Sequence, residues 1–203
     1  TVRATDPRGL FVNTTFNVIV MSVNDEPTLD PINSPIVVLE DAALQTVNLN
    51  GITSGASNEP QTLTVTAVSS DVLVVPDPAV QYTSADIQGT LTFQPVPNAS
   101  GSVTITVTVR DNGGTANGGD DTIVRTFVID VQSVNDQPTL DPIPDPAPIL
   151  EDAAEQSINL TGITDGANES QNLTVTATSS DPSIIPDPQV TYASPGTTGT
   201  LRY

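Results

Sequence analysis

The sequence repeats itself with a long period, and this repeat constrains the fold more than any other feature. Val23–Ile32 reads VNDEPTLDPI and returns 111 residues later as VNDQPTLDPI at Val134–Ile143. The match continues at the same spacing through LEDAA, which begins at Leu39 and again at Leu150. Well over half of the aligned positions are identical. A period of this length corresponds to a whole domain rather than to one turn of a solenoid.

The repeat divides the chain into three segments. Thr1–Asp6 aligns with Thr106–Asp111, so the chain begins inside the last strands of one repeat. One complete repeat follows, and the next is present up to its middle strands. We name these the N-terminal, middle and C-terminal segments, covering residues 1–25, 26–136 and 137–203. The sequence has no initiator Met and no targeting segment, and we expect it to be part of a longer protein.

The composition is strongly acidic. The net charge is −19, from 24 acidic residues against five arginines, and there is no Lys, His, Cys or Trp. Such a surface repels nucleic acid and anionic membranes and attracts divalent cations. No apolar run is long enough to cross a bilayer, which excludes membrane insertion of this segment. Without His, Cys or Lys the usual catalytic bases and nucleophiles are absent, and we expect no enzyme.

Hydrophobic residues alternate with threonines along the middle segment. Val103–Val109 has this period of two, as do Leu63–Ala67 and the long stretch Ile123–Val131. We therefore expect one face of each stretch to be buried and the other to be exposed to solvent. Asp111–Asp121, DNGGTANGGDD, is typical of a hairpin loop. With about seven short strands and no helical period, the sequence predicts an all-β fold of tandem seven-stranded Greek-key β-sandwiches.

Four motifs, in one order along each repeat, carry a family resemblance. They are SVNDEPT (later SVNDQPT), LEDA, GITDGANESQNLTVTA and LTFQPVPNASGSVTITVTVRDNGG. In this order they resemble the cadherin-like tandem repeats of large bacterial surface and adhesion proteins. The resemblance covers the whole chain. It implies immunoglobulin-like sandwich domains that are stacked end to end, outside the cell or on its surface.

The resemblance also implies calcium at the joints between domains. The ligands implied for the joint between the middle and C-terminal segments are Glu40, Asn135, Asp136, Asp165 and Glu169. Those implied for the joint before the middle segment are Asn24, Asp25, Glu59 and Asp111, with Ser54 where the next repeat has Asp165. Glu151 is expected to serve a joint beyond this chain. Ca²⁺ takes six to eight oxygen ligands, which three converging segments can supply.

This sequence departs from the family pattern at two places, and a second interpretation of the linker stays open. The first linker Asp is replaced by Ser22 and Ser133, and the family's acidic LDRE motif has no counterpart. We therefore expect fewer or weaker ions at each joint. In the alternative interpretation the Asn-Asp pairs form turns that lead into Pro27 and Pro138. Asp120–Asp121 is expected to be a solvated acidic loop, with a local cation site as the alternative.

The predicted function is structural. We expect a repeat of a long extracellular bacterial protein, acting as a rod, stalk, fibre or adhesin shaft. Its partners are then the neighbouring repeats, with further copies in a filament if chains complete each other's broken domains. The alternative function is a carbohydrate- or protein-binding adhesion module with a cell-surface glycan or protein as partner. Few aromatic residues are present to stack on sugars, which favours the structural function.

Overall fold

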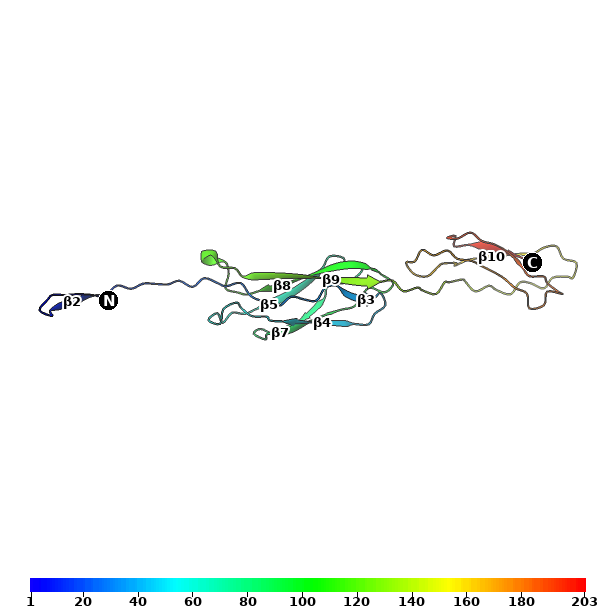
Figure 1. Cartoon of the computed structure of the whole chain (residues 1–203). Coiled ribbons are helices and arrows are strands. Elements are labelled where there is room, and N and C mark those ends of the chain that lie inside the picture. Colours follow the sequence, from blue (N-terminus) through cyan, green and yellow to red (C-terminus); the bar gives the residue numbers. More distant parts are fainter.

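The computed structural model describes residues 1–203 and is almost entirely β-structure, drawn out in a row (Figure 1). The single helical element is the 3₁₀ turn η1 (Ala116–Gly118). No helix is long and apolar enough to cross a membrane. The strands are β1 (Val2–Thr5), β2 (Phe11–Thr14), β3 (Ile36–Leu39), β4 (Gln45–Asn50), β5 (Thr64–Ser69), β6 (Ala79–Gln81), β7 (Gln88–Phe93), β8 (Gly101–Arg110), β9 (Thr122–Gln132), β10 (Ser157–Leu160), β11 (Gln189–Thr191) and β12 (Gly199–Arg202).

The middle segment is a β-sandwich of two sheets. One sheet has the order β3-β9-β8-β5 and the other the order β4-β7-β6. All neighbours are antiparallel except β3 and β9, which run parallel. Four of the six connections between successive strands therefore cross between the sheets, as in immunoglobulin-like domains. The all-β sandwich prediction is confirmed, with seven strands in this segment.

The core of the sandwich follows from the period-two pattern. On β8, Val103, Ile105, Val107 and Val109 are at most 1% exposed, whereas the threonines between them face outward or lie half-buried. Ile105 lies opposite Phe127 of β9, which is itself 1% exposed. Each such side chain contributes about 1.5–3 kcal/mol on burial. The β8–β9 pair therefore provides the centre of the core.

The C-terminal segment contains one sheet of the same design. Its order, β10-β12-β11, corresponds to β4-β7-β6. The register also corresponds, because Leu160 pairs with Gly199 as Leu49 pairs with Gly89. Residues 147–150 and 174–179, which align with β3 and β5, form no strand. Their partners in the middle segment are β9 and β8, which have no counterpart among residues 137–203.

The N-terminal segment is a hairpin followed by an extended stretch. β1 and β2 pair only with each other, and the guanidinium of Arg3 lies 3.4 Å from the centre of the Phe11 ring. Residues 15–27 contain no strand. In Figure 1 the hairpin lies at the opposite end of the molecule from the C-terminal segment.

Candidate functional site at the segment joints

Glu40 attaches the linker to the middle segment. It follows the last residue of β3, and only 3% of it is exposed. Its backbone N–H donates to the carbonyl oxygen of Gln132 at 2.9 Å, which extends the β3–β9 pairing. Its side-chain Oε1 accepts the backbone N–H of Val134 at 2.7 Å. The first linker residues after β9 are thus held against the middle segment.

Glu169 and Gln171 hold the other half of the linker against the C-terminal segment. The backbone N–H of Asp136 donates to Glu169 Oε1 at 2.8 Å. Gln171 Nε2 donates to Asn135 Oδ1 at 2.5 Å and also to Glu169 Oε2. The loop approaches so closely that a Cβ on Gly166 would lie 2.6 Å from the Cβ of Asp136. Three of the four linker residues after Gln132 are therefore hydrogen-bonded, Val134 to the middle segment and Asn135 and Asp136 to the C-terminal segment.

One hydrogen bond joins the two segments directly. Asn168 Nδ2 donates to the carbonyl oxygen of Asn98 at 2.7 Å. Both residues have left-handed backbone angles, with φ of 55° and 58°. Asparagine adopts this conformation more readily than most residues because its short amide bonds to the nearby backbone. Neither residue was predicted from the sequence, although the Pro-, Asn-, Ser- and Gly-rich stretch around Asn98 is a loop signal.

The joint before the middle segment uses an equivalent set of contacts. Asn24 Nδ2 donates to Asp111 Oδ1 at 3.0 Å and to the carbonyl oxygen of Asp120 at 2.6 Å. Gln61 Nε2 donates to Asn24 Oδ1, as Gln171 does to Asn135. The Asp25 N–H donates to Glu59 Oε1 at 3.2 Å. A linker amide, a loop glutamine and a loop glutamate therefore recur at both joints, and the glutamines were also missed.

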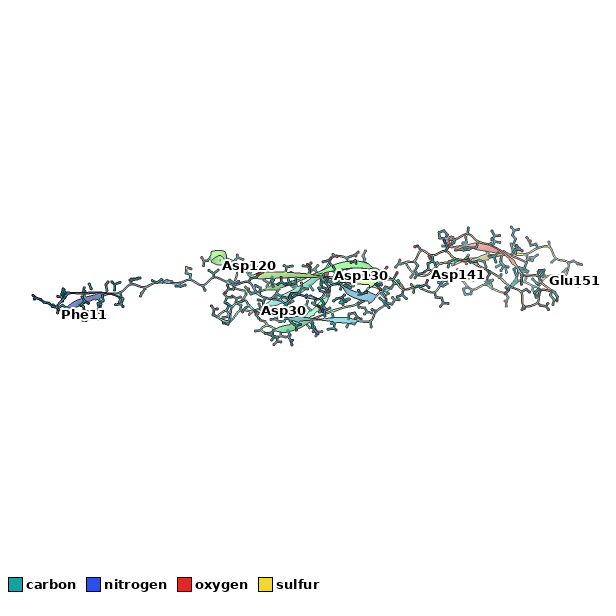
Figure 2. The ribbon with its side chains drawn as sticks, viewed as in Figure 1. Phe11, Asp30, Asp120, Asp130, Asp141 and Glu151 are labelled. Atoms are coloured by element: carbon teal, nitrogen blue, oxygen red, sulfur yellow. The ribbon has the colours of Figure 1, made fainter.

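The structure places nine of the ten expected ligand residues in two groups. The first group is Asn24, Asp25, Glu59 and Asp111. The second is Glu40, Asn135, Asp136, Glu169 and Asp165, whose Oδ2 accepts the Gln171 N–H at 2.5 Å. Glu151 is exposed and lies at the far end of the C-terminal segment (Figure 2). Ser54 donates its hydroxyl to the Glu59 carbonyl oxygen at 2.7 Å.

A calcium ion at a joint needs several oxygen ligands that converge on one point. Nowhere do three or more acidic side chains converge closely enough to hold a metal. However, Asp111 Oδ2 and Asp136 Oδ2 are buried and have no hydrogen-bond partner. An unpaired buried oxygen of this kind costs about 1–3 kcal/mol, and more if it is charged. Each joint therefore has one aspartate oxygen without a partner, which is the kind of ligand that a hard cation such as Ca²⁺ takes.

One of the two acids of the hairpin loop is not solvated as expected: Asp120 is exposed, whereas Asp121 is buried. Asp121 is 8% exposed rather than solvated, and its Oδ2 lies 2.9 Å from Arg110 Nη2. The Thr122 hydroxyl donates to Asp121 Oδ1 at 2.7 Å. The Thr122 and Arg110 hydrogen bonds lower the pKa of Asp121 below its usual value. Asp121 is thus satisfied inside the protein, because the β8–β9 pairing brings Arg110 opposite Thr122.

An open polar groove lies on the β4-β7-β6 sheet. It has a volume of about 450 Å³ and is lined by residues that include Asn48, Asn50, Gln81 and Tyr82. A groove of about 560 Å³ lies at the matching place in the C-terminal segment. The Tyr82 ring packs against the core, and burial raises the pKa of its hydroxyl. Tyr82 is half-buried, so only part of its side chain faces the groove.

Comparisons with known proteins give distant structural likenesses only. No family model matches the chain, and no curated protein matches it. Domains 4 and 5 of the S-layer protein SbsC share 18% identity, with 52% of this chain and 53% of that one covered and a TM-score of 0.32. Domains 1–6 of SbsC share 15% identity, with 95% and 22% covered and a TM-score of 0.33. Titin domains z1z2, solved with telethonin, share 15% identity, with 90% and 82% covered and a TM-score of 0.35. The fold assignment rests on the strand pairing of the chain itself.

Proposed function

We propose that this chain is a structural spacer of an extracellular surface protein, in which β-sandwich units are joined end to end by fastened linkers. The observation that carries the proposal is the linker after β9. Carboxylates of Glu40 and Glu169 accept its backbone N–H groups from opposite sides, and Asn168 bonds to Asn98 across the joint. A linker bound in this way has few free backbone torsions left, so the joint resists bending.

The remaining features support a mechanical rather than a chemical role. The acids that the sequence repeats are used to hold backbone, and they do not gather around one cavity. The groove on the β4-β7-β6 sheet is lined by one aromatic residue, Tyr82, which is half-buried. A chain without His, Cys or Lys also has few means of catalysis, so we propose no enzymatic activity. The absence of Cys and the net charge of −19 suit a soluble surface exposed to the medium.

We further propose that calcium strengthens both joints. Before the middle segment, the ion would be held by Asp111, the Asp120 carbonyl and the Asn24 side-chain oxygen. The Asn24 amide would have to turn over for this, because its Nδ2 now donates to both of the other groups. After it, the ion would be held by Asp136, Asn135 and Glu169. Binding would satisfy the two orphaned aspartate oxygens and relieve the repulsion between neighbouring acids. Extracellular modules of this kind have dissociation constants of about 10⁻⁴–10⁻³ M.

Small-angle X-ray scattering on the full chain tests the spacer. The wild type should give a long, narrow distribution of interatomic distances. The triple variant Glu40→Ala, Asn168→Ala, Glu169→Ala should give a shorter mean interatomic distance and a broader distribution. The reason is that the linker N–H groups lose their acceptors, so the joint bends more freely. Glu151→Ala is the matched control, an exposed acid far from the joint, and should leave the distribution unchanged. If the triple variant scatters like the wild type, these residues do not stiffen the joint.

A further inference from the structure

The first and last strands of the middle segment lie side by side and run in the same direction. β3 and β9 pair in parallel over four residues, from Ile36 opposite Ile129 to Leu39 opposite Gln132. The chain enters the middle segment through the linker before β3 and leaves it through the linker after β9. Because these two strands are parallel, the linkers extend from opposite ends of the sandwich, as Figure 1 shows.

The contact between the entering chain and β9 is longer than the four paired residues. At the exit end, the Glu40 N–H donates to the Gln132 carbonyl oxygen at 2.9 Å, and Glu40 Oε1 accepts the N–H of Val134 at 2.7 Å. At the entry end, the Val128 N–H donates to Ser34 Oγ at 2.9 Å. Hydrogen bonds therefore join residues 34–40 to β9 and to the first residues after it.

The residues that precede this contact are also bonded to the sandwich. The Thr28 N–H donates to the carbonyl oxygen of Thr53, shortly after β4, at 2.9 Å. Arg125 Nε of β9 donates to the Leu29 carbonyl oxygen at 3.1 Å. The entering chain is thus attached to both sheets before it reaches β3.

The parallel arrangement decides how the middle segment responds to tension. A pull on the two linkers draws β3 toward the entry end and β9 toward the exit end. The hydrogen bonds of a parallel pair are evenly spaced across the gap between the strands, so a pull along the strands strains all of them together. Strands that are pulled apart from one end lose their bonds one at a time. Sliding β3 past β9 therefore has the higher barrier, and forced unfolding is governed by the unfolding rate.

We propose that β3 and β9, with Glu40 at the end of their contact, form a clamp that keeps the middle segment folded when its linkers are pulled apart. The clamp gives the spacer resistance to tension, and its use in the protein rests on the proposed spacer function. A spacer transmits any force that acts on its ends. In this chain that force reaches the β3–β9 bonds before it reaches the strands between them in sequence.

Neighbouring residues of β3 provide a matched pair of variants. Two residues before the Glu40 bond on each strand, the same register places the Val38 N–H against the Asp130 carbonyl oxygen. The N–H of Val37 faces the other way, to the open edge of the sheet, because β3 is an edge strand. The next repeat has Pro148 at the position of Val37, and proline is tolerated where a strand N–H is unpaired.

The first test is single-molecule pulling of the full chain in two directions. The chain has no Cys, so introduced cysteines give unique attachment points. Glu26→Cys with Gln137→Cys pulls on the two linkers, whereas Ala43→Cys with Gln137→Cys pulls β3 and β9 apart from the same end. All three positions are exposed. Unfolding of the middle segment is identified by the length released, about 3.3–3.6 Å for each residue between the attachment points.

At equal force, the linker direction should give a lifetime at least about tenfold longer, the effect of two or more hydrogen bonds that break together at the barrier. In that direction Val38→Pro should shorten the lifetime about tenfold, because one bond is lost and the Asp130 carbonyl oxygen loses its donor. Val37→Pro is the control and should change the lifetime by less than about twofold. In the other direction Val38→Pro should have a smaller effect, since the bonds break one at a time.

Two results would overturn the proposal. Equal lifetimes in the two directions show that the β3–β9 pair is not loaded as a unit. Equal lifetimes of Val37→Pro and Val38→Pro in the linker direction show that its bonds do not set the barrier. Circular dichroism establishes beforehand whether Val38→Pro folds, and if it does not, the two directions measured on the unaltered strands decide. Scattering measures the bending of a joint between folded segments, so the spacer function and the clamp can each fail alone.

Discussion

Two glutamates, one on each side of a linker, show how single residues shape this protein. Glu40 and Glu169 both accept backbone N–H groups of the linker. The family resemblance implied that both would be metal ligands. Their observed partners depend on which N–H groups the strand ends leave unpaired, and a one-dimensional pattern does not contain that information. Asn98 and Asn168 were missed for the same reason, since their bond joins residues 70 positions apart.

Asp121 provides a pH prediction. Its pKa is lowered in the folded state, first by the Thr122 hydroxyl and then by Arg110, so folding favours the ionised form. The stability it contributes is therefore present above its unfolded pKa of about 3.9 and is lost as the pH falls through the lower folded value. Asp121→Asn should be less stable than the wild type at pH 7. It should also lose less stability on acidification below about pH 4.

The pH prediction can be measured by urea unfolding between neutral and acid pH, followed by hydrogen exchange in β8 and β9. Glu26→Gln is the control, because Glu26 is an exposed acid of the same segment whose side chain makes no hydrogen bond. It should follow the wild-type curve. If Asp121→Asn loses as much unfolding free energy on acidification as the wild type does, the Arg110–Asp121 pair does not contribute to stability.

At the scale of the strands, pattern and structure agree closely. The alternation in β8 and β9 identified the buried residues, because a strand with one face against the core places every second side chain inside. The parallel pairing of β3 with β9 was not predicted. Register and sheet order depend on which edges meet after the chain crosses between layers, and several crossings satisfy the same alternation.

The β8–β9 pair should control the stability of the middle segment. Phe127→Ala removes a side chain that is 1% exposed at the centre of the core. We expect it to lower the free energy of unfolding by about 3–5 kcal/mol. Val124→Ala lies on the same strand but is 49% exposed, and it should change that free energy by no more than about 0.5 kcal/mol. Urea unfolding of both variants measures the difference, and similar losses would contradict the assigned core.

At the scale of the whole molecule, the chain is a row of small units with a large negative charge. The net charge of −19 is spread over loops, strand ends and joints. Repulsion between these acids favours an extended molecule and destabilises each unit. Salt screens this repulsion in general, whereas a bound ion acts at particular oxygens. The two effects can therefore be separated by experiment.

Calcium should stabilise the chain beyond its effect as a salt. At 1 mM calcium and a dissociation constant of about 10⁻⁴–10⁻³ M, linkage gives roughly 0.4–1.4 kcal/mol per site. The melting temperature in calcium should be higher than in sodium chloride of equal ionic strength. The Asp136→Asn variant should show a smaller difference between the two salts. Glu151→Gln serves as the control. Equal melting temperatures in the two salts would show that calcium does not stabilise the joints, and that hydrogen bonds alone hold them.

The sequence by itself determined the unit, the strands and the inward-facing residues. A 111-residue repeat and a period of two are properties of the chain in one dimension, and burial follows from them directly. Only the tertiary structure decided how the repeated acids are used. Whether Glu40 meets a metal or the Val134 N–H depends on three-dimensional convergence, which here brings a backbone donor within 2.7 Å and gathers no three carboxylates.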